Sequence, residues 1–157
     1  MARDGTWFYH GSPIGRKAIT KLFATVLRRE DDGSYWLVTP AERGRIDVDE
    51  VPFVAIDMTV ESAGRGQRLI FTTNLDETVV AGPAHRLWLE PAPAGEEGVR
   101  PYVHVRDGLV ARLSRPVFYR LAELAEADDD GTPGVWSDGA FFALAAVGQM
   151  ESGERRR

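Results

Sequence analysis

Three polar side chains stand two residues apart in an otherwise apolar stretch, where they could bind an anion together. Tyr102, His104 and Arg106 alternate with valines, and a period of two places them on one face of a β-strand. Arg16 and Arg115 each open a predicted helix, at the end where the helix dipole favours negative groups. An arginine at this end is electrostatically unfavourable. A bound phosphate or carboxylate would offset that unfavourable interaction. These five residues are therefore the best candidate anion patch.

Two further clusters of polar groups lie at the ends of predicted strands. Thr39 and Glu42 follow one strand, with Arg45 close enough to balance the carboxylate, and Thr72 and Asn74 end another. Such groups can line the mouth of a cleft and hold an anion or the edge of a base. They can equally cap or close a turn, and the sequence leaves both interpretations open.

The familiar catalytic and metal-binding motifs are missing from the sequence. Its glycines lack the spacing of a phosphate-binding loop, and no Gly-x-Ser-x-Gly segment occurs. The histidines, His10, His85 and His104, are scattered rather than paired with carboxylates, so neither a metal nor a cofactor is predicted. An enzyme acting on a nucleotide or phosphorylated substrate stays an alternative, with Glu42, Asp57 or His104 as acid or base.

Hydrophobic periodicity predicts the elements that would position these residues. A helix after residue 16 should bury one apolar stripe, made of Ile19, Leu22, Phe23, Val26 and Leu27, and end at the acidic turn 31–33. The clearest strand covers 53–61, with one buried face made of Val54, Ile56, Met58 and Val60. Shorter strands are predicted at 35–39, 46–48, 69–72, 87–90, 102–106 and 110–113.

A repeat of about one hundred residues is visible in the chain. Each copy opens on an arginine, contains an Asp-Asp-Gly turn and continues to a tryptophan: Arg16, 31–33 and Trp36 in the first, Arg115, 129–131 and Trp136 in the second. An aromatic strand with a histidine precedes each copy. The pattern predicts duplicated strand–helix–strand units that pack together and leave a cleft at their junction.

Composition is that of an ordinary globular chain. The length of 157 residues is enough for one domain or two very small ones. Of these residues 43% are hydrophobic and 27% are charged, both near the globular average. A net charge of −5 argues against a nucleic-acid partner. Without cysteine, a signal-peptide core or a stretch of membrane-spanning length, the chain is expected to be cytoplasmic.

Seven segments, in order, resemble the bacterial domain-of-unknown-function family 1285. They are GSPI (11–14), YWLVTPAE (35–42), VPF (51–53), FTTN (71–74), RPYV (100–103), RPVFY (115–119) and VWS (135–137). The resemblance implies a duplicated α+β core with a pleckstrin-homology-like C-terminal half, a nucleotide-type ligand between the halves and a role in signal transduction. It assigns no catalytic residues. At 41–44 the chain departs from the family, whose members are bulkier and more basic there.

Together these patterns predict an α+β fold of two small mixed domains, residues 1–78 and 79–150, followed by a frayed tail at 151–157. The second domain is the one expected to resemble a pleckstrin-homology barrel. The leading hypothesis for function is a module that binds a nucleotide-like anion and takes part in signalling with a protein partner. The alternatives are a protein-docking module without a ligand and, less favoured, the enzyme described above.

Overall fold

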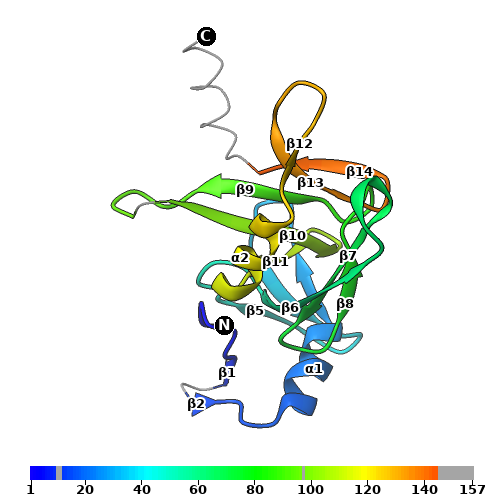
Figure 1. The fold of residues 1–157 in the computed structure, drawn as a ribbon. Helices are drawn as coiled ribbons and strands as arrows, with labels where there is room; N and C mark the ends of the chain where they lie inside the picture. Colours follow the sequence, from blue (N-terminus) through cyan, green and yellow to red (C-terminus); the bar gives the residue numbers. More distant parts are fainter. Residues whose placement is uncertain (10–11, 97, 145–157) are drawn as a thin grey trace.

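A curled six-stranded sheet forms the centre of the molecule (Figure 1). The computed structural model describes residues 1–9, 12–96 and 98–144. In spatial order the sheet contains β8 (Thr78–Val80), β7 (Arg68–Thr73), β6 (Phe53–Glu61), β11 (Leu109–Leu113), β10 (Val99–Arg106) and β9 (Leu87–Pro91). Strands β6–β8 and β9–β11 are two antiparallel meanders, and the parallel pair β6–β11 joins them. The fold is therefore of the predicted α+β class.

Each of two short helices is followed by a three-stranded antiparallel sheet. Helix α1 (Lys17–Thr25) precedes β3 (Leu27–Arg29), β4 (Tyr35–Val38) and β5 (Arg43–Ile46). Helix α2 (Arg115–Glu123) precedes β12 (Glu126–Ala127), β13 (Pro133–Ser137) and β14 (Ala140–Ala143). A hairpin comes before each helix: β1 (Phe8–Tyr9) with β2 (Ser12–Pro13) before α1, and β10–β11 before α2. One 3-10 turn, η1 (Gly64–Gly66), links β6 to β7.

Helix α1 is shorter than predicted and buries a different face. It ends before Leu27, which is fully buried as part of strand β3. The buried residues of the helix are Thr20 and Ala24, whereas Leu22 is 66% exposed and Ile19 is 39% exposed. The predicted buried stripe is wrong for these last two residues, because the helix turns its small side chains toward the rest of the protein.

A β-bulge decides which residues of β6 face the core. The single buried face predicted for this strand is wrong, because Ile56 is 51% exposed and Val60 is 37% exposed. The register against β7 shifts between Ala55 and Asp57. An extra residue at such a shift reverses the alternation of side chains between the two faces of the strand. Ala55 therefore faces the core before the bulge and Met58 faces it after the bulge.

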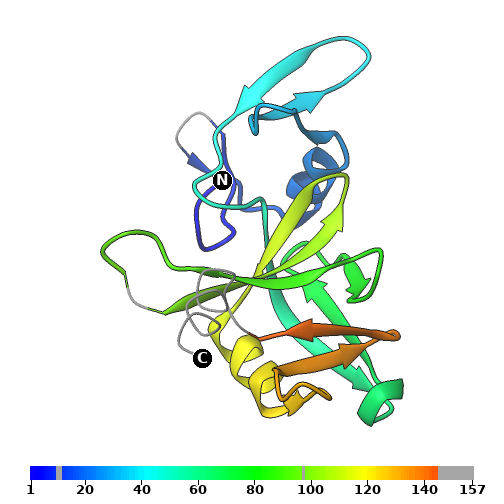
Figure 2. The ribbon, with the colours of Figure 1, turned by 90° about the horizontal axis from the view of Figure 1, so that it is seen from above.

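One apolar core connects all parts of the described chain. It contains Met1, Trp7 and Leu27 from the N-terminal part together with Phe53 from the sheet and Val135 from β13. Figure 2 shows the resulting layers from above: the N-terminal part lies on one side of the six-stranded sheet, and α2 with β12–β14 lies on the other. Residues far apart in the sequence thus share one interior.

Candidate functional site

A cavity of about 780 Å³ lies between the N-terminal segment, helix α1 and the β4–β5 hairpin. Its wall is mainly apolar: Trp7 and Phe8 come from the N-terminal segment, Phe23 from α1, and Leu37 and Ile46 from the hairpin. Figure 2 shows these three segments around one region on the same side of the sheet. The volume is typical of sites that take small molecules. We call this cavity the N-terminal pocket.

Polar residues of the β4–β5 hairpin also line the N-terminal pocket. Thr39, Glu42 and Arg45, three of the residues singled out from the sequence, all line it. The Thr39 hydroxyl accepts the amide N–H of Glu42 at 3.1 Å and donates to the carbonyl oxygen of Glu42 at 3.2 Å. Thr39 therefore closes the hairpin. Glu42 and Arg45 are exposed, and the strand register places the Arg45 side chain on the face of Trp36, opposite Leu37 and Ile46.

Tyr102 belongs to a charged cluster that attaches the N-terminal segment to the sheet. Its hydroxyl donates to Glu50 Oε1 at 2.6 Å, and the guanidiniums of Arg100 and Arg112 contact Glu50 Oε2 at 2.8 and 3.1 Å. Arg3 of the N-terminal segment lies 3.8 Å from the same oxygen. We call these five residues the Glu50 cluster.

The Glu50 cluster shifts the titration of both acidic groups in it. Burial alone raises the pKa of Glu50, but the hydrogen bond from Tyr102 and the adjacent guanidiniums of Arg100 and Arg112 outweigh burial and lower it. Burial and the neighbouring carboxylate raise the pKa of Tyr102. The stable arrangement is therefore an ionised Glu50 that accepts a hydrogen bond from a neutral Tyr102.

Arg106 holds helix α1 and does not lie beside Tyr102. The register of β10 against β11 shifts between His104 and Arg106. The Arg106 guanidinium donates to the carbonyl oxygen of Ala24 at 3.0 Å and lies 3.2 Å from the carboxylate of Glu77. A cation at the C-terminal end of a helix is stabilised by the helix dipole. The single face predicted for this strand is therefore interrupted by the bulge.

A second cavity, of about 430 Å³, lies between α1 and the turn after β7, with Arg106 in its wall. Lys21 and Asp76 also line it, and both lysines of the chain pair with Asp76. Lys17 and Lys21 contact the carboxylate of Asp76 at 2.7 and 3.5 Å. Each cation named here already has a carboxylate partner, so this cavity is less suited to an anion than the N-terminal pocket.

The side chain of His104 contacts Gly108 and His85. Its Nε2 accepts the amide N–H of Gly108 at 3.2 Å, and its ring stacks on His85 with 6.0 Å between the ring centres. The Nδ1 of His85 lies 3.1 Å from the carbonyl oxygen of His104. His10, the counterpart of His104 in the proposed repeat, lies outside the described residues.

Asn74 links the N-terminal segment to the sheet. Its side-chain oxygen accepts the amide N–H of Val54 at 3.0 Å, and its side-chain nitrogen donates to the carbonyl oxygen of Gly5 at 3.2 Å. Thr72 lies two residues earlier, on β7, where it pairs with Asp57 of β6. Neither Asn74 nor Thr72 lines the N-terminal pocket.

Arg16 and Arg115 stand at the starts of α1 and α2, as predicted. Both are exposed, and neither guanidinium forms a hydrogen bond or ion pair with the residues that the structure describes. The two helices lie on opposite sides of the six-stranded sheet (Figure 2). The structure therefore does not bring the five residues of the predicted anion patch together.

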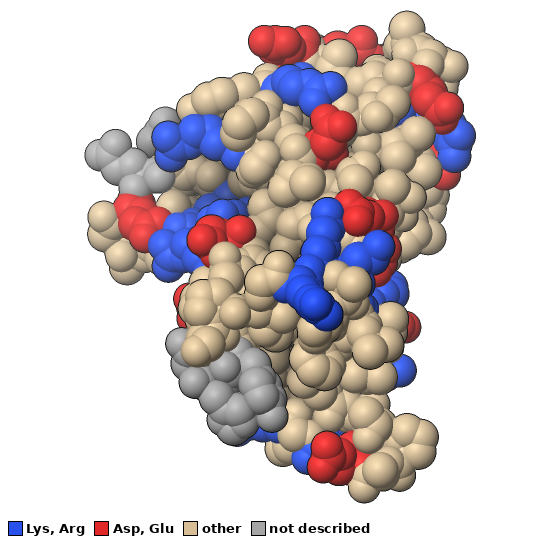
Figure 3. Space-filling view, turned by 90° about the horizontal axis from the view of Figure 1, so that it is seen from below, with Lys and Arg blue, Asp and Glu red and all other residues tan. Residues whose placement is uncertain are grey.

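Charged side chains of both signs are interspersed over the face of the molecule seen from below. Figure 3, which shows the molecule from below, has acidic and basic residues side by side without a large area of one sign. Within residues 1–9, 12–96 and 98–144, no group of three or more His, Cys, Asp or Glu side chains could hold a metal ion. Both described helices have nine residues, and neither is long and apolar enough to cross a membrane.

No local pattern in the sequence marks the wall of the N-terminal pocket or Glu50. Trp7 and Phe8 have the composition of a strand, and Phe23 has the spacing of a helix core. Hydrophobic periodicity is the same whether a side chain fills a core or lines a pocket. Glu50 stands in a loop, and only the fold brings it to Tyr102.

Two family models together cover the chain as far as residue 144. The N-terminal domain of DUF1285, a domain of unknown function, matches residues 1–51, and the C-terminal domain matches residues 52–144. They meet in the loop between β5 and β6, whereas the division after residue 78 stays a prediction from the sequence. The predicted tail at 151–157 lies outside the described residues. No curated protein matches the chain.

Two crystal structures are similar to this one. A DUF1285 family protein from Silicibacter pomeroyi DSS-3 is 48% identical, with a TM-score of 0.85, over 95% of this chain and 80% of that one. A DUF1285 family protein from Shewanella baltica OS155 is 25% identical, with a TM-score of 0.57, over 76% of this chain and 85% of that one. With both family domains present in order, the chain belongs to the DUF1285 family.

Proposed function

We propose that the chain is a binding module for a small ligand and that the N-terminal pocket is its binding site. One observation carries the proposal: a cavity of about 780 Å³ is walled mainly by aromatic and aliphatic side chains and is also lined by a few polar residues. Sites for small molecules typically combine a large apolar wall with a few polar groups that fix orientation.

The pocket favours a ligand with a large apolar part and one polar end. Trp7, Phe8 and Phe23 offer aromatic faces to a flat ring or an alkyl chain. Among the charged residues that line the pocket, Arg45 attracts an anion and Glu42 repels one. The side chain of Arg45 stands on the outer face of the hairpin, opposite Leu37 and Ile46. A nucleotide-like anion remains a candidate because its base suits the aromatic wall, but the apolar part of the ligand is expected to supply most of the affinity.

The indole N–H of Trp7 supports the same proposal. Trp7 is 2% exposed and lines the pocket, yet its Nε1 has no hydrogen-bond partner among the described residues. A buried donor without an acceptor costs about 1–3 kcal/mol. A ligand acceptor that reaches this N–H would remove the cost, so binding is expected to involve a small adjustment of the Trp7 ring.

The remaining parts of the hypothesis concern how binding would be used. The hairpin, helix and three-stranded sheet that occur twice support a duplicated origin for the two parts of the chain. The family resemblance supports a pleckstrin-homology-like second half and a role in signalling. In that scheme, ligand in the pocket changes how the N-terminal segment rests on the sheet, and a partner protein detects the change.

Filling the pocket tests the proposal. Gly44 lines the pocket, and a Cβ added there meets nothing within 4 Å, so Gly44→Leu places a side chain in the cavity without a clash. Gly66→Leu is the matched control, because Gly66 has the same free space but lies in η1. The readout is the melting temperature with a panel of nucleotides, medium-chain carboxylates and aromatic carboxylates.

At least one compound is expected to raise the melting temperature by about 5 °C or more at a hundredfold excess over Kd. The shift should be kept in Gly66→Leu and lost in Gly44→Leu. An equal shift in both variants would place the ligand elsewhere, and no shift with any compound would leave the proposal without support.

A further inference from the structure

We propose that the ligand is an extended peptide segment that pairs with the free edge of strand β5 and inserts apolar side chains into the N-terminal pocket. The proposal rests on the proposed function, since it names the class of ligand that the same pocket takes. Three features carry it: the direction of the main-chain groups of β5, an existing contact on the same edge, and the position of the pocket along that edge.

Strand β5 ends the order β3–β4–β5, and β4 is its partner within the described chain. Val38, which is opposite Arg43, donates its amide N–H to the carbonyl oxygen of Val26, on the side away from β5. In an antiparallel ladder bonded and non-bonded pairs alternate. Arg43 and Arg45 therefore direct their main-chain N–H and C=O groups away from β4, toward the free edge.

The chain itself already pairs with the continuation of this edge. Just past β5, the carbonyl oxygen of Asp47 accepts the amino group of Met1 at 2.7 Å, and the amide N–H of Asp49 donates to the carbonyl oxygen of Met1 at 3.1 Å. Every second residue of an extended chain presents its main-chain groups to the same edge. Arg43 and Arg45 are thus the next positions of an edge that accepts a main-chain partner.

The N-terminal pocket runs along the same edge. All four residues of β5, from Arg43 to Ile46, line it. Neighbouring side chains of a strand point to opposite faces, so four consecutive residues line one pocket only if it extends along the edge of the strand. A segment laid on this edge would direct every second side chain toward the apolar wall.

Apolar surface at the rim of the pocket is uncovered in the described structure. Phe8 is 44% exposed and Ile19 is 39% exposed, and both line the pocket. They come from different elements, the N-terminal segment and helix α1. Apolar side chains of a bound segment would cover both residues, so alternate positions of the peptide are expected to be aliphatic or aromatic.

The peptide residues between these apolar positions face the outer side of the β3–β4–β5 sheet. There the side chain of Arg45 favours an acidic residue. Arg43 is already ion-paired with Glu30, and its guanidinium lies 4.4 Å from the ring centre of Trp36. Arg45 forms no ion pair with the described residues. The preferred partner is therefore an extended segment with apolar residues at alternate positions and a carboxylate opposite Arg45.

The test uses a dye-labelled pentapeptide, acetyl-Leu-Glu-Leu-Ser-Leu amide, and fluorescence polarisation with the full chain. Two doubly N-methylated analogues, isomers of each other, are compared with it: one is methylated on the main-chain nitrogens of Glu and Ser, and the other on those of the second and third leucines. In a strand these two sets of N–H groups face opposite edges. One isomer is expected to bind at least about tenfold more weakly and the other within about threefold of the parent, because only one edge of the peptide pairs with β5.

Variants of β5 test the same pairing from the protein side. Arg45→Pro removes the edge-facing N–H, and proline is tolerated where the N–H of an edge strand faces outward. Arg45→Ala is the matched control, because it removes the side chain and keeps the N–H. Affinity is expected to fall about tenfold further in Arg45→Pro than in Arg45→Ala. A peptide with Lys in place of Glu should bind the unmodified protein several-fold more weakly, and Arg45→Ala should remove that preference.

Equal binding of the two methylated isomers to the unmodified protein would overturn strand pairing, whether or not Arg45→Pro folds. Sedimentation of the free chain as a dimer that Arg45→Pro dissociates would also overturn it, since the edge would then pair with a second copy. If the peptides fail to bind while a small carboxylate or nucleotide gives a shift that Gly44→Leu abolishes, the peptide proposal fails and the proposed function stands. If neither binds, both fail.

Discussion

Glu50 connects three parts of the chain through one carboxylate. It lies in the loop before β6, accepts the hydroxyl of Tyr102 and contacts Arg100 and Arg112 from the sheet, with Arg3 of the N-terminal segment close by. Its side chain is 14% exposed, so these groups largely replace water around the carboxylate. Replacing the Glu50 carboxylate by a neutral group would leave the partly buried guanidiniums of Arg100 and Arg112 with a weaker partner.

Glu50→Gln is therefore expected to lower the free energy of unfolding at neutral pH by about 2 kcal/mol. The pKa of Glu50 is lower in the folded protein than its ordinary value of 4.5, so the stabilisation is present above that value and disappears as the pH falls through the folded pKa. Urea unfolding of both proteins between pH 7 and pH 3 checks this. The difference between them should shrink below about pH 4.5.

The control for this measurement is Glu61→Gln. Glu61 is half exposed and pairs with Arg68 at 2.9 Å on the surface. An exposed pair of this kind contributes about 0–1 kcal/mol. A loss in Glu50→Gln that is no larger than in Glu61→Gln, or one that does not change with pH, would contradict the role given to the Glu50 cluster.

Residue types alone placed only part of the candidate site. Thr39, Glu42 and Arg45 do meet at the N-terminal pocket. Tyr102 and Arg106 have instead found partners inside the protein, because a polar group at the end of a strand serves a turn or an ion pair as well as it serves a ligand. Which of these it does depends on residues distant in the sequence.

At the scale of elements, local periodicity predicted the positions of strands better than the direction of their side chains. Strand β6 and the starts of both helices lie where they were expected. The bulges near Ala55 in β6 and near His104 in β10 were not predicted, because a bulge depends on the register of the neighbouring strand. Each bulge moves every later side chain to the other face, so local patterns fail beyond it.

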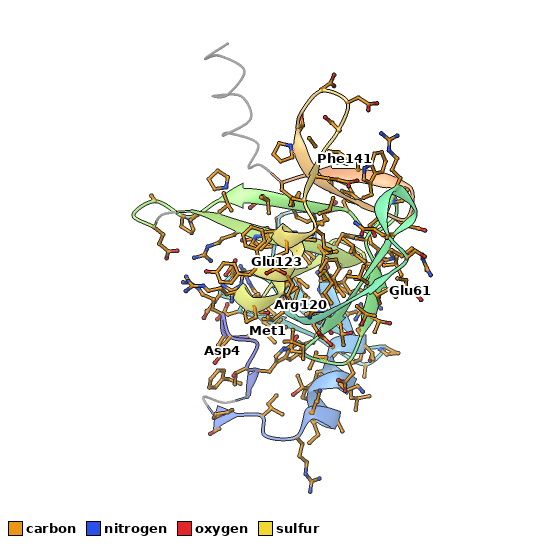
Figure 4. All side chains as sticks on the ribbon, in the orientation of Figure 1. Met1, Asp4, Glu61, Arg120, Glu123 and Phe141 are labelled. Atoms are coloured by element: carbon orange, nitrogen blue, oxygen red, sulfur yellow. The ribbon has the colours of Figure 1, made fainter. Side chains whose placement is uncertain are left out.

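Helix α2 is attached to strand β6 through Arg120, one of the residues labelled in Figure 4. Its guanidinium donates to Asp57 at 2.9 Å and to the carbonyl oxygen of Met58. The hydrogen bond from Arg120 is the main reason why the pKa of Asp57 lies below its ordinary value of 3.8. The contact is exposed, so it orients the helix more than it stabilises the fold.

Arg120→Met is expected to return the pKa of Asp57 toward 3.8 and to leave the free energy of unfolding nearly unchanged. Carboxyl chemical shifts followed by NMR during a pH titration check the first expectation, and urea unfolding checks the second. Arg115→Met, on the same helix, is the control. An unchanged titration of Asp57 in Arg120→Met would show that the contact is not formed in solution.

At the scale of the whole molecule, the two family domains share one interior. Met1, Trp7 and Leu27 of the first pack in the same core as Phe53 and Leu109 of the second. The Glu50 cluster, Asn74 and Arg106 add polar contacts across the same boundary. A division of the core between two independent units is not visible within the described residues.

The protein is therefore expected to unfold in one cooperative transition. In calorimetry the measured enthalpy should equal the van't Hoff enthalpy, as for a single domain of this size. Arg106→Met should lower the melting temperature without splitting the transition. Two resolved transitions in the unmodified protein would mean that the N-terminal and C-terminal domains melt separately, and that the shared core does not couple them.

The parallel pair β6–β11 also has a consequence for biosynthesis. Its ladder joins Phe53 to Ala111, whereas the two meanders on either side of it close through short turns. On the ribosome, β6 emerges long before β11, and an unpaired strand edge readily attracts other chains. The nascent chain thus carries an open edge until Leu113 has left the exit tunnel, which makes this interval the one in which a chaperone would matter most.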